Sequence, residues 1–157
     1  MSDESQAKKF LARLLSGEIA PPAFAITLGL EAGSFGDGTA SFTMKTDPVR
    51  HGNVMGTLHG GALAALADTA MGFAFSTTLA GDESFATLEM KVNFVRPVWV
   101  ATLTARATVV HRGKTTGLVE CRVTDESDRL IGHATSTCLV LSGAQAKGRA
   151  LGDMPGG

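Results

Sequence analysis

Helical and strand-like hydrophobic patterns follow one another along the chain, and each predicts its own set of elements. Between residues 5 and 16, apolar side chains recur three and four positions apart, which predicts a short amphipathic helix. The apolar stripe of this helix consists of Phe10, Leu11, Leu14 and Leu15. Gly17 and the two prolines at 21–22 come next and predict the end of the helix.

Residues 59–80 form a second helical segment, preceded by a predicted loop at 46–57, and this segment is apolar on nearly every side. A helix with that pattern is expected to be buried all round. Its longest part without an ionisable residue, 69–81, has 13 residues, fewer than the ~20 that a membrane-spanning helix needs. We therefore expect a buried helix of a globular domain and no membrane partner.

Alternation of apolar and polar residues predicts strands on both sides of the long helix. Before the helix, strands at 26–30 and 39–45 with a turn at 33–38 predict a hairpin. Four more strands are predicted after the helix, at 86–94, 102–109, 119–123 and 130–141. Turns are predicted at 111–117 and 125–129.

The predicted order is thus a short helix, two strands, a long helix and four strands. Hairpin-length connections imply an antiparallel sheet, and the apolar helix has to be wrapped by that sheet. We expect an α+β fold in one domain at residues 21–142. Residues 1–20 are expected to form the N-terminal helix and a linker, and residues 143–157, rich in Gly, Ala and Pro, a flexible tail.

Composition narrows the class of protein. The chain has 157 residues, 44% hydrophobic and 18% charged, which is typical of one globular domain. The net charge of −1 argues against nucleic acid as a partner. Only two cysteines occur, Cys121 and Cys138, and the N-terminus lacks the apolar core of a signal peptide, so we expect reduced cysteines and a cytoplasmic location.

One carboxylate interrupts the apolar segment 51–75, which contains Asp68 and neither lysine nor arginine. On a helix, the positions three and four residues from Asp68 are occupied by alanine, methionine and glycine, so no cation lies beside it. Burial of such a carboxylate is costly and raises its pKa. Either Asp68 caps a nearby backbone group or serine, or it is retained for chemistry.

The sequence His59-Gly60-Gly61 begins the same helix. Two glycines there allow a ligand or another backbone to come close, and the free N–H groups of a helix start can hold a developing oxyanion. The alternative is that these residues only shape a tight turn into the helix. With Asp68 activating a water and Gly60 polarising a carbonyl, the pattern indicates acyl hydrolysis. The two residues are separated by about 12 Å along one helix, so a symmetric dimer with shared sites is expected.

The segment GTLHGGALAALADTAMG (56–72), preceded by Asn53 and followed by four strands and the motif VNFVRP, resembles the hotdog-fold acyl-CoA thioesterases. The branch it is most similar to includes the phenylacetate-pathway thioesterases and thioesterase superfamily member 2. The resemblance covers about residues 20–141 and implies a hotdog fold, in which the antiparallel sheet wraps the long central helix. It also implies an acyl-coenzyme A substrate with an aryl or medium-chain acyl group, no cofactor, and a homo-oligomer, usually a tetramer of two dimers.

The resemblance also implies roles for individual residues. The Gly60 N–H would bind the thioester carbonyl, and Asp68 of the opposite subunit would act as general base or nucleophile. Asn53 would orient the water or the thioester, and His59 would support the loop. Thr87 would hold the water.

Three cations are candidates for binding the phosphates of coenzyme A: Arg96, Arg112 and Lys114. Gly61 is a candidate for close contact with the substrate. The alternative for each cation is a solvated surface charge. An apolar acyl pocket is expected from Phe73, Phe75 and Leu79.

Other chemistries fit less well. The GKT sequence at 113–115 lacks the earlier glycine of a phosphate-binding loop, and no G-x-S-x-G elbow of a serine hydrolase is found. The four histidines form no HxH or HxxxH pair, so no metal site is expected. A dehydratase or hydratase of the same fold would need a histidine paired with an acid. A non-catalytic acyl-CoA binding module remains the alternative function.

Overall fold

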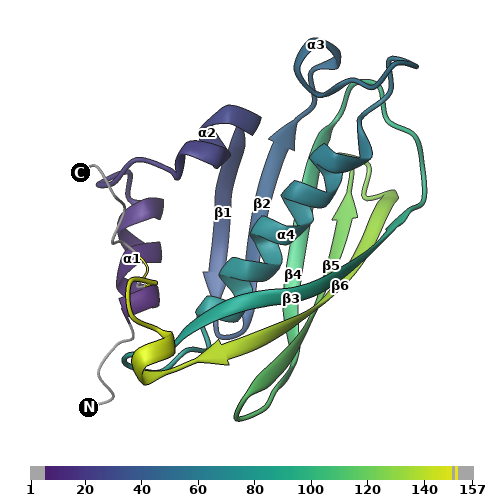
Figure 1. The fold of residues 1–157 in the computed structure, drawn as a ribbon. Coiled ribbons are helices and arrows are strands. Elements are labelled where there is room, and N and C mark those ends of the chain that lie inside the picture. The colour runs from purple at the N-terminus through teal and green to yellow at the C-terminus, as the bar shows by residue number, and fades with distance from the viewer. Residues whose placement is uncertain (1–5, 150, 152–157) are drawn as a thin grey trace.

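A six-stranded antiparallel sheet curves around one long helix, α4, in the computed structural model, which describes residues 6–149 and 151 (Figure 1). The helices are α1 (Gln6–Leu15), α2 (Ala23–Leu28), α3 (Pro48–His51) and α4 (Gly60–Ser76), and the 3-10 helix η1 is Gly143–Gln145. The strands are β1 (Leu30–Gly36), β2 (Thr39–Lys45), β3 (Ser84–Phe94), β4 (Thr102–Arg112), β5 (Thr116–Thr124) and β6 (Leu130–Leu141). The predicted α+β fold with a long central helix is confirmed.

The strand order is β1-β2-β4-β5-β6-β3, and every neighbouring pair is antiparallel. β1 and β3 are therefore the two edges. The core lies between the concave face of the sheet and α4, whose side chains Leu66, Met71 and Phe75 are fully buried. They face buried side chains of the central strands such as Met44 and Leu103.

The first predicted hairpin is partly wrong. Of the residues expected as a strand at 26–30, the first three belong to the helix α2, which is capped by Gly29 in the left-handed conformation with φ 66°, and only Leu30 is in a strand, β1. β1 then runs through the expected turn at 33–38, with a bulge between Ala32 and Phe35, and leaves only two residues to connect it to β2. Those two are an Asp-Gly pair, which favours a two-residue hairpin.

Two other boundaries differ from the prediction. The predicted loop 46–57 contains the short helix α3, whose N-cap Asp47 accepts a hydrogen bond from the N–H of Val49. The predicted turn 111–117 shortens to three residues because β4 and β5 continue pairing into it.

α4 is shorter than predicted, because it stops at Ser76 rather than at residue 80. The hydroxyl groups of Ser76, Thr77 and Thr78 each donate to the carbonyl three residues earlier, at 2.7 Å. These bonds satisfy the last carbonyls of the helix with side chains, so the backbone ladder ends there.

The expectation that α4 is buried all round is wrong for one face. Gly61 and Asp68 are exposed, and the residues of the same face that lie between or just beyond them are only half-buried. We call this face the small-residue stripe: Gly61, Ala64, Ala65, Asp68, Thr69 and Gly72. Its spacing of three and four residues places all six on one side of the helix.

Cys121 and Cys138 are free and buried, as expected for reduced cysteines. In the part of the chain that the structure describes, no helix has the length and apolarity required to cross a membrane. The same residues contain no group of three or more His, Cys, Asp or Glu side chains arranged to hold a metal ion.

Candidate active site

The start of α4 presents a backbone N–H group for which the described residues provide no acceptor. His59 is the N-cap, and its Nδ1 accepts a hydrogen bond from the Gly61 N–H at 2.8 Å, so the neutral ring carries its proton on Nε2. The His59 carbonyl accepts from Ala62 at 3.0 Å and from Leu63 at 3.4 Å. Of the first four N–H groups of the helix, only that of Gly60 has no acceptor among the described residues. A free N–H at the positive end of a helix dipole can stabilise an oxyanion.

Buried His51 fixes the chain that leads into α4. Its Nδ1 accepts from the Asp47 N–H at 3.0 Å, and its Nε2 lies 3.0 Å from the Leu28 carbonyl. Because Nδ1 is an acceptor, Nε2 is the donor to that carbonyl. The His51 carbonyl accepts from the His59 N–H at 2.7 Å, so His51 links α2, through its ring, to the N-cap of α4, through its backbone.

Asn53 organises the loop before α4. Its Oδ1 accepts from the backbone N–H groups of Met55 at 2.9 Å and Thr57 at 3.2 Å, and its Nδ2 donates to the Thr57 hydroxyl at 2.9 Å. These bonds account for the rigid shape of the loop. The predicted contact of Asn53 with a water or thioester stays a prediction.

The connection between β3 and β4 lies beside the start of α4. The Leu58 N–H donates to the Val98 carbonyl at 2.7 Å, and a Cβ on Gly60 would lie 3.0 Å from Cζ of Phe94. Glycine at position 60 thus allows the Phe94 ring, which is 60% exposed, to lie against the backbone that carries the free N–H. Arg96 follows in this connection, with its own N–H bound to the Ile131 carbonyl at 3.2 Å.

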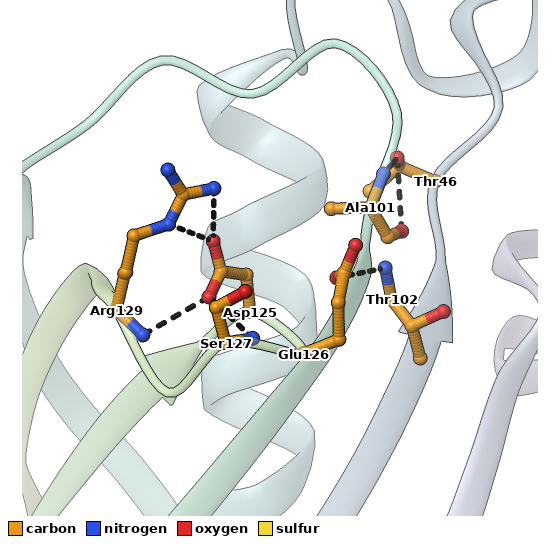
Figure 2. A network of polar contacts seen from close by, with 7 residues as sticks. All are labelled: Thr46, Ala101, Thr102, Asp125, Glu126, Ser127 and Arg129. Carbon is orange, nitrogen blue, oxygen red and sulfur yellow. Dashed lines mark hydrogen bonds and ion pairs between the residues drawn. The ribbon is translucent and has the colours of Figure 1, made fainter.

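A polar network holds this connection at its far end, where β4 begins (Figure 2). Thr46 exchanges backbone and hydroxyl hydrogen bonds with Ala101, and Glu126 accepts from the Thr102 N–H at 2.9 Å. The carboxylate of Asp125 accepts from Arg129 Nε at 2.7 Å and from two backbone N–H groups. Burial opposes ionisation of Asp125, but the bonds from Arg129 and from the backbone outweigh it and lower the pKa of this carboxyl. Of these contacts, the bonds between Thr46 and Ala101 hold the last residue of the connection that carries Arg96.

Asp68 lies two turns further along α4, on the small-residue stripe. Its carboxylate makes no hydrogen bond or ion pair with any described residue, so the alternative of a capping carboxylate is not what the structure shows. Desolvation by the surrounding protein raises the pKa of Asp68 above the ordinary aspartate value. A partly desolvated, unpaired carboxylate on a helix face is well suited to accept a proton.

Asp68 and Thr87 line the same cavity, which has a volume of about 210 Å³. Its other walls come from α2 and the preceding Pro22, from α4, from β3 and from Leu151, and most of these residues are apolar. The described lining residues are Pro22, Phe24, Ala25, Asp68, Thr69, Gly72, Phe73, Ser76, Phe85, Thr87 and Leu151. The structure therefore brings together two of the predicted catalytic residues at the edge of an apolar chamber.

Thr87 is positioned by the pairing of β3 with β6. It lies opposite Cys138, next to a bulge between Thr87 and Glu89, and bulges re-aim side chains at strand edges. Burial, with a smaller contribution from the Asp68 carboxylate, raises the pKa of the Cys138 thiol, while the hydroxyls of Ser136 and Thr87 act against the rise. The thiol is thus protonated at neutral pH and serves as a neutral neighbour of the Thr87 hydroxyl.

The three candidate phosphate-binding cations do not lie together. Arg96 is exposed at the end of the molecule that carries Gly60, whereas Arg112 and Lys114 lie at the other end of β4, roughly 30 Å away by strand rise. Arg112 is bound to Glu83 at 2.7 Å and stacks over the Phe75 ring at 5.5 Å. Its charge is therefore already compensated, and Lys114 stands in an exposed turn.

Of the three residues predicted for an apolar acyl pocket, one lines the cavity beside Asp68. Phe73 lines the cavity, but Phe75 is fully buried in the core and Leu79 lies elsewhere. Phe24 and Phe85 were missed. The apolar alternation of β3 pointed to an inward Phe85, whereas the contribution of Phe24 depends on the tertiary placement of α2.

The structure thus separates the predicted residues into two groups. Gly60, His59 and Asn53 lie at the N-terminal end of α4, and Asp68 and Thr87 lie beside the apolar cavity. Asp68 is eight residues from Gly60, about 12 Å along the helix.

Comparison with known proteins identifies related chains. Residues 55–131 match the model of the thioesterase superfamily. The chain is 35% identical to the acyl-coenzyme A thioesterase PaaI of Escherichia coli, over 69% of this chain and 76% of that protein. It is 30% identical to the 1,4-dihydroxy-2-naphthoyl-CoA hydrolase of Listeria monocytogenes, over 67% and 85%. The solved structure of the PaaI protein of E. coli superposes with a TM-score of 0.74 at 28% identity, covering 86% of this chain and 96% of that one.

Proposed function

The chain belongs to the thioesterase superfamily and is a thioester hydrolase with a hotdog fold, and from this premise we propose that its substrate is an acyl-coenzyme A. Both relatives described above carry names that specify coenzyme A thioesters. An apolar cavity of about 150 Å³ is enough to hold benzene. The chamber of about 210 Å³ beside Asp68, with its aromatic walls, supports an aryl or medium-chain acyl group.

The observation that carries this proposal is the unpaired Asp68 carboxylate beside Thr87 at the edge of an apolar chamber. Thr87 holds a water through its hydroxyl, and Asp68 takes a proton from that water as it attacks the thioester carbonyl carbon. The Gly60 N–H stabilises the oxyanion of the tetrahedral intermediate. Collapse of the intermediate breaks the carbon–sulfur bond, the proton held by Asp68 passes to the leaving thiolate, and the free acid and coenzyme A are released.

One chain does not supply both catalytic groups to one thioester, because about 12 Å separates Gly60 from Asp68 along α4, whereas reacting atoms approach to about 3 Å. We propose that a second copy provides the missing group, so that Gly60 of one subunit serves Asp68 of the other. Two unpartnered surfaces support this: the small-residue stripe and the edge strand β3, which exposes 57% of Leu88 and 60% of Phe94. Two such dimers form the proposed tetramer.

In the proposed site, His59 and Asn53 hold the loop that presents Gly60, and Gly61 keeps the substrate path clear of side chains. Arg96 is the favoured partner of the coenzyme A phosphates, because it is exposed at the same end of the molecule as Gly60. Arg112, already paired with Glu83, and Lys114 are less suited to the same ligand.

The test is the release of free thiol from a panel of aryl- and alkyl-CoA thioesters by the wild type, by Asp68→Asn and by Asp82→Asn. Asp82 is a matched control, an exposed aspartate outside the Asp68 cavity. We expect turnover by the wild type and the control, and a loss of about 10²–10⁴-fold in Asp68→Asn, the usual contribution of a general base. Equal turnover by Asp68→Asn refutes the mechanism. Binding of acyl-CoA by the wild type without thiol release establishes the binding-module alternative.

A further inference from the structure

An aromatic chain connects the N-terminal helix to the wall of the acyl cavity. The ring of Phe10 in α1 stacks on Phe73 in α4, with centroids 6.5 Å apart and planes at 13°. Phe73 also contacts Phe42 at 5.0 Å and Phe35 at 5.8 Å. Because Phe73 lines the cavity beside Asp68, the position of its ring defines part of the space available to an acyl group.

The neighbours of Phe73 differ in how firmly they are held. Phe42 is a buried residue of β2, and Phe35 belongs to the edge strand β1, so the backbone of both residues is held by the pairing of β1 with β2. Phe10 comes from a separate helix that packs against the edge strand β1, beside the region of α4 that carries Phe73 (Figure 1). Loss of the Phe10 ring therefore leaves Phe73 free to turn toward α1, away from the cavity.

α1 is securely attached to the domain, which makes it a dependable support. Ala7, Leu11 and Leu14 are buried on its inner face, and Lys8 forms an ion pair with Asp37 in the β1–β2 turn. The helix nevertheless lies outside the segment 55–131 that matches the family model.

We propose that Phe10 is a positioning residue for substrate selection: by backing Phe73, it sets the limit of the acyl cavity and so the longest acyl group that the enzyme accepts. The inference rests on the proposed acyl-CoA thioesterase activity and deepens it. With Phe10 present, the cavity of about 210 Å³ takes a single ring or a chain of comparable bulk. Without Phe10, the cavity extends toward α1 and admits longer chains.

The test compares kcat/KM for straight-chain acyl-CoAs from butyryl to dodecanoyl in the wild type, Phe10→Ala, Phe10→Leu and Leu15→Ala. Leu15 is a control on the same helix, 47% exposed and not among the residues that line the cavity beside Asp68. We expect Phe10→Ala to raise the ratio of kcat/KM for long-chain acyl-CoA to kcat/KM for short-chain acyl-CoA by about fourfold for each additional methylene admitted. Phe10→Leu should raise the same ratio by less, because leucine fills part of the space of the ring. Hydrolysis of the shortest substrate is expected to change little, because Asp68 and Thr87 are not moved.

A double-mutant cycle separates this role from a general effect on stability. Phe73→Leu opens the cavity directly, so adding Phe10→Ala to it should leave the chain-length profile unchanged. An unaltered profile in Phe10→Ala and Phe10→Leu, with thermal unfolding showing folded variants, overturns the inference alone. An equal shift in Leu15→Ala overturns it as well. A wild type that hydrolyses no acyl-CoA of the panel overturns both this inference and the proposed function.

Discussion

Replacement of Gly60 by proline removes the proposed oxyanion donor with little disturbance of the helix. Gly60 is the first residue of α4, where proline is well tolerated because the N–H there makes no helical bond. The preceding residue, His59, has φ −65° and ψ 133°, the extended conformation that a residue before proline requires. Loss of one oxyanion N–H typically lowers kcat by about 10²–10³-fold, equivalent to about 2.7–4 kcal/mol.

Gly60→Ala is the matched control for this variant. Both substitutions place a Cβ 3.0 Å from Cζ of Phe94, whose exposed ring has room to shift, but only proline eliminates the N–H. Thiol-release kinetics should therefore show Gly60→Pro about 10²-fold or more below Gly60→Ala, with melting temperatures close to each other. A kcat of Gly60→Pro within a few-fold of Gly60→Ala refutes the role of this N–H.

Three further results are expected. Activity should rise with pH, with a midpoint above the ordinary pKa of aspartate, because Asp68 has to be ionised to accept a proton. The native state disfavours ionised Asp68, so Asp68→Asn should be more stable than the wild type at neutral pH. In thermal melts below the ordinary pKa of aspartate, this difference in stability should vanish. Gly117→Ala places a Cβ 2.2 Å from a buried core ring, so calorimetry should show a Tm lower by about 3–10 °C, whereas Gly81→Ala, with nothing within 4 Å, should not change it. Arg96→Gln should raise KM for acyl-CoA but not for an acyl-pantetheine, which lacks the phosphates. Arg112→Gln should lower Tm and leave KM unchanged, because Arg112 is already paired with Glu83. An equal rise of KM for acyl-CoA in both variants would contradict the assignment of Arg96 to the phosphates.

The sequence patterns were sufficient where periodicity was long and unbroken. The run of small and apolar residues after Gly60 predicted α4, and the strict alternation in 102–109 predicted one of its covering strands, β4. The three apolar residues at 26–30 were too few to distinguish a strand from one turn and a half of helix. Gly29, in the left-handed conformation, ends α2 as glycine commonly does, but that signal helps only where the segment before it is already predicted to be helical.

The candidate site was predictable only in part, for physical reasons. Asp68 and Gly60 stand out because a charge and a helix start are local features. The small-residue stripe was expected to be buried because alanine and glycine are apolar, and no pattern says which face of such a helix lacks a cover within one chain. The compensation of Arg112 by Glu83, 29 residues away in sequence, arises from tertiary packing alone.

The central claim, that each active site combines Gly60 of one subunit with Asp68 of the other, is tested most directly by mixing two inactive variants. Gly60→Pro and Asp68→Asn, unfolded and refolded together, form mixed dimers in which one site carries both changes and the other carries neither. Since half of randomly paired dimers are mixed, thiol release should recover to about a quarter of the wild-type value. Mixtures as inactive as the separate variants, despite mixed dimers shown by mass spectrometry, would contradict the shared site.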